Sequence, residues 1–186
     1  MKATHLFGTT IILAMLTTSP VIAADPPGRE FTCTAVVNTT EGTRRIPMTL
    51  VVNRFTSIEE AQQLADLIEK GGQGTLLSAL RGRMDGRLQL GALSSPIALV
   101  VAEETRDGYR FIFVTARRIQ VDERQLGKDS LNYPFGIADF EVDGFSGWGE
   151  GSLHTAAALS IDADGHIEID DYDGQDGRFE DLRRIR

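Results

Sequence analysis

Three titratable side chains at alternate positions near the C-terminus form the most chemically suggestive set in the chain: His166, Glu168 and Asp170. On a strand they share one face, while Ile167 and Ile169 point to the other. An imidazole and two carboxylates in a row can bind a divalent metal or exchange protons. The same alternation is what a half-exposed strand needs simply to be soluble, and no fourth ligand is evident. We therefore expect a solvated face without a metal, and keep a metal-assisted hydrolase that uses these three residues as the alternative function.

A glycine-rich segment at residues 144–148 invites comparison with the Gly-x-Ser-x-Gly nucleophile elbow of serine hydrolases. The second glycine falls one position early, and Trp148 occupies its place. The segment also lacks the strand-to-helix context that exposes such a serine. We interpret it as a hairpin crossing with Trp148 packed on the sheet, and predict no catalytic residue.

Two further motifs are better explained by turns and helix ends than by ligands. Residues 71–75, Gly-Gly-Gln-Gly-Thr, precede a helical pattern, but no Lys-Ser or Lys-Thr pair follows them as a nucleotide P-loop requires. The acidic stretch at residues 162–177 fits no EF-hand frame, because neither start at Asp162 nor start at Asp171 gives glycine at position 6 and glutamate at position 12. The sequence therefore predicts no cofactor.

Two single residues with reactive side chains are interpreted as structural. Cys33, the only cysteine, alternates with Phe31, Ala35 and Val37, which indicates a small buried side chain on an apolar strand face. His154 stands on a face of small residues and is expected to pack rather than to act as a base.

The candidate ligand-binding residues are Tyr109, Phe111 and Phe113, which alternate along one aromatic-rich segment. That segment and the apolar run at residues 97–102 flank Asp107-Gly108, and Asp-Gly between alternating segments is a strong hairpin signal. We expect the two runs to form the central hairpin of a sheet, with the aromatic face available to a small apolar ligand.

The elements that position these residues follow the same periodicities. Strands are expected around residues 46–52, 97–102 and 109–114, and then, in a continuing meander, at 135–142, 153–161, 166–172 and 179–185. Ser57 to Glu60 is a capping box that starts a helix ending at Gly71-Gly72, and a shorter helix covers residues 75–80. The predicted fold class is α+β: an antiparallel meander of eight or nine strands with a helix pair inserted after the second strand. Such a sheet is long enough to curl into a barrel, although the sequence leaves closure open.

The N-terminus has the features of an export signal. Lys2 precedes a short apolar run, and Val21 and Ala23 occupy the small positions before an expected cleavage site. The run is too short to span a bilayer, and we expect no membrane span. The chain is then divided into a signal peptide (1–23), a short linker (24–30) and a single domain (31–186). Localisation is expected to be periplasmic or extracellular.

Charge narrows the classes of partner. The whole chain carries 19 basic and 27 acidic residues, and removal of Lys2 with the signal leaves 18 against 27, or a net charge of −9. Such a balance argues against nucleic acid as a partner, because phosphates attract the opposite sign. An unknown small molecule or envelope protein remains as the expected partner, and the oligomeric state is left open.

The order of short motifs resembles that of a group of uncharacterised exported bacterial proteins without an assigned activity. The motifs are the strand and capped helix at residues 51–60, the segment at 106–119, Tyr-Pro-Phe at 133–135, and Gly-Glu-Gly at 149–151. The resemblance implies a small exported domain and supplies no catalytic or ligand residues. We therefore expect a non-catalytic domain that binds a small ligand or a partner protein.

Overall fold

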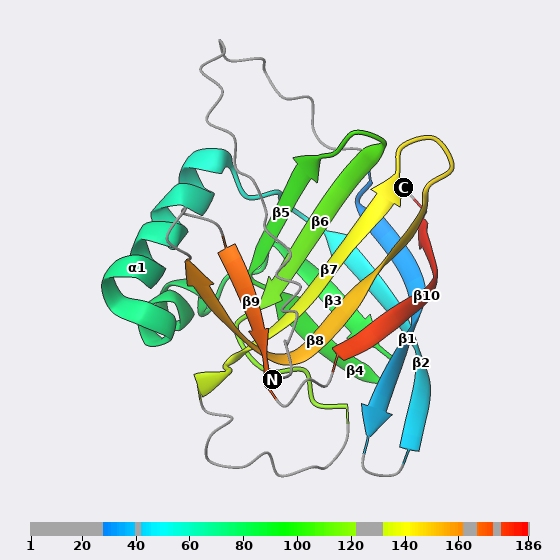
Figure 1. Cartoon of the computed structure of the whole chain (residues 1–186), viewed down its shortest axis with the longest axis horizontal. Coiled ribbons are helices and arrows are strands. Elements are labelled where there is room, and N and C mark those ends of the chain that lie inside the picture. Colours follow the sequence, from blue (N-terminus) through cyan, green and yellow to red (C-terminus); the bar gives the residue numbers. More distant parts are fainter. Residues whose placement is uncertain (1–27, 40–41, 122–131, 162–166, 173–175, 186) are drawn as a thin grey trace, which may run out of the picture.

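The structure, a computed structural model, describes residues 28–39, 42–121, 132–161, 167–172 and 176–185. These residues form ten strands in one antiparallel sheet and one helix (Figure 1). The antiparallel sheet is confirmed, but it has more than the eight or nine strands expected, and the fold is mostly β rather than an even α+β mixture. The elements are β1 (Glu30–Thr39), β2 (Gly42–Val52), α1 (Ile58–Leu80), β3 (Gly86–Leu90), β4 (Leu93–Ile97), β5 (Leu99–Glu104), β6 (Gly108–Thr115), β7 (Phe135–Asp143), β8 (Trp148–Ile161), β9 (Ile167–Asp171) and β10 (Asp176–Arg184).

The sheet is an up-and-down meander that curls into a nearly closed barrel. Its strand order is β4-β3-β2-β1-β10-β8-β7-β6-β5, with β9 attached to β8. The two ends of this order, β4 and β5, are separated along the chain by Ala98 alone. Residues 93–104 therefore act as one bent strand, which pairs with β3 through its first half and with β6 through its second half. This arrangement leaves few unpaired edges.

Alternate residues of the strands fill the interior of the barrel with apolar side chains. The phenyl rings of Phe31, Phe111, Phe113 and Phe140 lie at its centre, each almost fully buried. The centroids of the Phe31 and Phe111 rings are 4.7 Å apart, and those of Phe113 and Phe140 are 5.3 Å apart. Aromatic contacts at these distances contribute beyond the area that they bury. The barrel interior is thus the main hydrophobic core.

Cys33 belongs to this core, as its alternation with Phe31 and Ala35 predicts. The thiol is free and buried, and it faces the barrel interior. Burial raises the pKa of the Cys33 thiol to about 12. The thiolate is the nucleophilic form of cysteine, so this side chain is a packing residue and not a reactive one.

The expected helix pair is wrong, because the chain forms the single helix α1 with a kink at Gly72. This residue alone leaves helical angles, with φ of 65° and ψ of −167°. The two glycines do not end the helix, because one residue at positive φ costs glycine little, and the helix resumes at once. Leu64 before the kink and Leu76 and Leu80 after it all pack on the outer face of the barrel. Burial of both halves against one surface explains why the helix continues.

The N-terminal cap of α1 is confirmed in one of its two parts. The Ser57 side chain accepts a hydrogen bond from the backbone N–H of Glu60 at 3.2 Å. The Glu60 carboxylate does not turn back to the cap as a full capping box requires, because it binds the guanidinium groups of Arg54 and Arg83 instead. The cap residue is therefore readable from local sequence, whereas the partner of Glu60 comes from tertiary structure.

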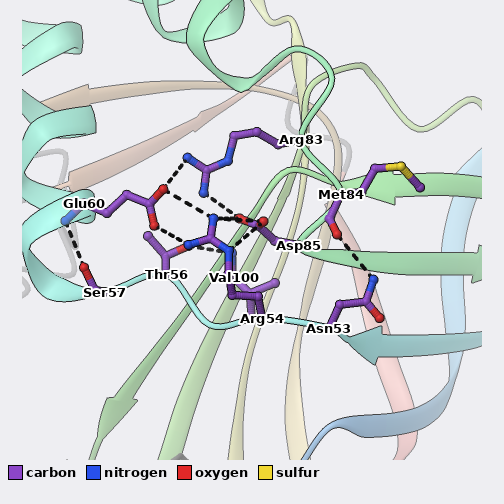
Figure 2. Close-up of polar contacts among 9 residues, drawn as sticks. All are labelled: Asn53, Arg54, Thr56, Ser57, Glu60, Arg83, Met84, Asp85 and Val100. Atoms are coloured by element: carbon purple, nitrogen blue, oxygen red, sulfur yellow. Dashed lines mark hydrogen bonds and ion pairs between the residues drawn. The ribbon is translucent and has the colours of Figure 1, made fainter.

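A cluster of four charged side chains, Arg54, Glu60, Arg83 and Asp85, joins the start of α1 to the end of the barrel (Figure 2). Asp85 is buried and accepts hydrogen bonds from Arg54 at 2.9 Å and from Arg83 at 2.5 Å. The Asp85 backbone carbonyl also accepts from the N–H groups of Asn53 and Arg54. Side chain and backbone of Asp85 together anchor the segment that leads from β2 into α1.

Candidate functional site

An open cleft lies on the outer surface where the β5–β6 and β7–β8 hairpins end. Its volume is about 350 Å³, within the range of small-molecule sites. Four of the residues that line it carry carboxylates and one is the single tryptophan of the chain. The lining consists of Thr105, Asp107, Gly108, Glu141, Val142, Asp143, Ser146, Trp148, Gly149 and Glu150.

Antiparallel register places two of the carboxylates directly opposite each other. Glu141 of β7 pairs with Glu150 of β8, and both side chains are exposed. Like charges in direct cross-strand positions destabilise a sheet. Within the part of the chain that the structure describes, neither carboxylate forms an ion pair. A bound cation would remove this repulsion.

The nearest cation along the same row of the sheet is already engaged. Arg110 of β6 pairs in register with Glu141, but its guanidinium forms a bidentate contact with Asp139, at 2.8 and 2.5 Å. The side chains of Arg110 and Asp139 are mostly buried, and their hydrogen bonds raise the pKa of Arg110. Such planar two-point contacts are the strong form of an arginine–carboxylate pair. Arg110 therefore fixes the sheet below the cleft, and Glu141, which also acts on the Arg110 charge, stays exposed to solvent without a direct ion pair.

The two hairpins that form the cleft are held together by backbone contacts. The N–H of Gly144 donates to the carbonyl of Asp107 at 2.9 Å. A Cβ at Gly108 would lie 2.0 Å from the carbonyl oxygen of Val142, so only glycine allows this approach. The Asp143 carboxylate accepts from the N–H groups of Phe145 and Ser146, and the bond from Ser146 is the main reason that the pKa of Asp143 is lowered. The Asp143 carboxylate is thus fixed in position by the backbone of the turn while it remains exposed.

Trp148 gives the cleft an aromatic wall. Its side chain is half exposed, and the guanidinium of Arg183 lies 5.1 Å from the ring centroid, a cation–π distance. The expectation that Trp148 packs on the sheet is therefore only part of its role, because the ring also faces solvent and carries a cation. The neighbouring Phe145 is fully exposed.

The residues predicted to bind a ligand lie elsewhere in the structure. Phe111 and Phe113 are buried in the barrel interior against Phe31 and Phe140, and Tyr109 packs beside them at the edge of the same core. They form one group, as predicted, but their rings contact other side chains of the core and do not line the cleft. Their role in ligand binding stays a prediction.

The set His166, Glu168 and Asp170 is described only in part, because His166 lies outside the described residues. Glu168 and Asp170 are exposed on β9, and Ile169 between them packs toward the core under α1. Asp170 accepts a hydrogen bond from the Tyr133 hydroxyl at 3.1 Å. Among the residues that the structure describes, no three histidine, cysteine or acidic side chains are grouped so as to hold a metal ion.

His154 is buried, as expected of a packing residue, and it has a partner that sequence reasoning missed. Its Nδ1 lies 2.7 Å from the Asp171 carboxylate, and both side chains are mostly buried. This pair joins β8 to the end of β9 across the hairpin between them. A histidine held at Nδ1 by a carboxylate has a fixed ring orientation, which here serves to attach β9.

The acidic cleft was missed although the sequence carries a signal for it. Glycines at 144 and 147 mark the turn between β7 and β8, and a hairpin centred there puts residue 141 opposite residue 150. Reading the register outward from the turn would have shown two glutamates side by side. The second hairpin of the cleft could not be placed in this way, because its contact with the turn is nonlocal.

Comparison of the chain with protein-family models, with curated proteins and with solved structures finds no match. Among the described residues, no helix has both the length and the apolar content that are needed to cross a membrane. The geometry of the cleft is therefore the basis for the proposed function.

Proposed function

We propose that this protein is a non-catalytic binding domain whose ligand carries an organic cation, an ammonium or guanidinium group, bound in the acidic cleft. The observation that carries the proposal is the pair Glu141 and Glu150, which face each other without an ion pair among the described residues. A cation between them would form two charge-assisted contacts and relieve the repulsion.

Trp148 favours an organic cation as the ligand. Quaternary ammonium, ammonium and guanidinium groups bind over indole rings, which are the best aromatic acceptors of cations. Arg183 already lies over the Trp148 ring, but Trp148 is half exposed, so a ligand cation would contact the exposed part of the indole. Carboxylates beside an accessible tryptophan are the combination that recognises a cation with an apolar or planar body.

The cleft is a better candidate for a ligand site than the barrel interior, which contains the aromatic residues predicted from the sequence to bind a ligand. The Phe31, Phe111 and Phe140 rings occupy the centre of the barrel in mutual contact. A ligand there would have to displace a packed core, which costs several kcal/mol. The cleft requires no such rearrangement.

Export belongs to the same proposal. Residues 1–27 lie outside the described residues, and the support for export comes from the sequence: Lys2, a short apolar run, and small residues at Val21 and Ala23. We expect the mature protein to begin at Ala24. Its intact mass, measured on protein recovered from the cell envelope or medium, tests this. An uncleaved N-terminus in that fraction would contradict it.

The binding proposal can be tested through intrinsic fluorescence, because Trp148 is the only tryptophan in the chain. Titration with agmatine, which carries a guanidinium and an amine, is expected to change the emission of Trp148 saturably. The double variant Glu141→Gln and Glu150→Gln is expected to bind at least about tenfold more weakly, which corresponds to about 1.4 kcal/mol. Its thermal midpoint should stay level or rise slightly, because the substitution removes a like-charge pair.

The matched control is Glu168→Gln, which neutralises an exposed carboxylate of β9 that does not line the cleft. This variant should bind agmatine as the parent does. A loss of affinity equal to that of the double variant would show that net charge alone, and not the cleft, attracts the ligand. The absence of any agmatine response in the parent would refute the proposal.

A further inference from the structure

The turn between β7 and β8 presents an aromatic surface beside the acidic cleft. Phe145 at its tip is 100% exposed, and Trp148 at its end is 50% exposed. The backbone N–H of Arg184 donates to the carbonyl of Gly147 at 2.8 Å, so the end of β10 supports the turn (Figure 1). Large exposed aromatic residues on one turn are typical of interaction surfaces, where tryptophan and other aromatic residues supply much of the binding energy.

The turn that carries Phe145 is ordered before any partner binds. Its N–H groups at Phe145 and Ser146 donate to the Asp143 carboxylate at 3.1 and 2.5 Å, and Gly144 is tied to the β5–β6 hairpin. A side chain on a fixed backbone loses little freedom on binding. Phe145 is thus a preorganised apolar anchor that contributes nothing to the core of its own domain.

The charge around the aromatic surface selects the kind of partner. Asp107, Glu141, Asp143 and Glu150 line the adjoining cleft. Two arginines lie at the same turn: Arg183 over the Trp148 ring, and Arg184, whose guanidinium donates to the carbonyl of Gly144. The four carboxylates outnumber them, so this surface repels an anionic lipid surface and attracts basic side chains. The Arg183 guanidinium over Trp148 shows that this aromatic surface accepts arginine within the molecule itself.

We propose that Phe145, Trp148 and the acidic cleft together dock an extended segment of another protein that carries arginine or lysine beside large apolar side chains. The proposal rests on the proposed function, since the cation of the partner segment occupies the cleft. It adds that the natural ligand is a peptide segment, whose apolar side chain packs on Phe145 while its cation lies between Glu141 and Glu150.

The test compares two probes on the full-length mature protein by calorimetry and by Trp148 fluorescence. One probe is agmatine, and the other is the acetylated, amidated hexapeptide Arg-Arg-Leu-Leu-Arg-Arg, which in an extended conformation presents both side-chain types on each face. We expect the peptide to bind at least about tenfold more tightly than agmatine.

Phe145→Ser is expected to lower the affinity for the peptide by about tenfold and to leave the affinity for agmatine unchanged. The Glu141→Gln and Glu150→Gln double variant should weaken both probes. Because Phe145 is fully exposed, its variant should melt as the parent does.

Each other outcome has a separate meaning. If Phe145→Ser leaves the affinity for the peptide unchanged while agmatine still binds to the cleft, the docking proposal fails and the proposed function stands. If neither probe binds the parent, both fail. The hexapeptide Glu-Glu-Leu-Leu-Glu-Glu controls for apolar adhesion, and equal binding of it would overturn the role of charge. Stronger binding to vesicles of phosphatidylcholine and phosphatidylglycerol than to the basic peptide would assign the surface to a membrane and refute the proposal.

Discussion

Asp85→Ala is expected to lower the free energy of unfolding by about 3 kcal/mol, because it removes the buried counter-charge of the mostly buried Arg83 guanidinium. The Asp85 side chain is 8% exposed and that of Arg83 is 18% exposed. Without Asp85, the Arg83 guanidinium keeps only Glu60 as an ion-pair partner, and its Nε already has no hydrogen-bond partner. The free energy of unfolding, measured with urea, checks the prediction.

The control for Asp85 is the same substitution in an exposed ion pair. Asp66 pairs with Lys70 one helical turn away at 2.8 Å, with side chains 61% and 72% exposed. Asp66→Ala should change stability by at most about 0.5 kcal/mol, as surface pairs contribute little. If Asp85→Ala costs no more than this control, burial of the cluster does not contribute to stability.

The same cluster should make the protein sensitive to acid. The hydrogen bond from Arg54 is the main reason that the pKa of Glu60 lies below its ordinary value. A lowered folded-state pKa stabilises the protein above the unfolded-state value of about 4.3, and this contribution is lost as the pH falls through the folded-state pKa. The thermal midpoint should therefore decrease as the pH is lowered below about 4. In the Glu60→Gln variant the midpoint should depend less steeply on pH over the same range.

Phe111→Ala is expected to cost about 3 to 5 kcal/mol, the usual loss when a buried phenyl ring leaves a cavity. Phe111 is completely buried, and the centroid of its ring lies within 6.4 Å of those of Phe31, Phe113 and Phe140. The same change at the fully exposed Phe145 should stay within about 0.5 kcal/mol. Chemical denaturation of the two variants checks the difference directly.

The comparison of Phe111→Ala with Phe145→Ala also tests the prediction that the aromatic residues of β6 bind a ligand. If Phe111 and Phe113 bound a ligand in an open site, Phe111→Ala would reduce binding while stability stayed near that of the parent. We expect the opposite order: a large loss of stability, with agmatine binding to the folded fraction unchanged. If Phe111→Ala keeps the stability of the parent but no longer binds agmatine, the ligand site lies in the barrel interior.

Local patterns in the sequence predicted most of the strands, the β5–β6 hairpin and the cap of the helix, but not the β3–β4 hairpin. The β5–β6 hairpin lies at one end of the strand order and not at its centre as expected. Alternation on either side of Asp107-Gly108 predicted β5 and β6, which pair from Leu99 with Val114 to Glu104 with Tyr109. Ser57 as the helix cap and Cys33 as a buried thiol were equally readable. These features depend on side chains within a few residues of one another, so propensity and periodicity suffice to find them.

Tertiary structure decided the features that join distant segments. The barrel is nearly closed because the chain bends at Ala98 and pairs with β3 before it and with β6 after it, a choice between partners that local pattern leaves open. The continuation of α1 through Gly72 was missed because burial of both halves on the barrel outweighs a preference expressed over two residues. The acidic cleft arises in the same way: register sets Glu141 opposite Glu150, and the contact from Gly144 to Asp107 brings in the second hairpin. The sequence alone determined which side chains each strand turns outward, and the folding of one hairpin against another decided which of them share a site.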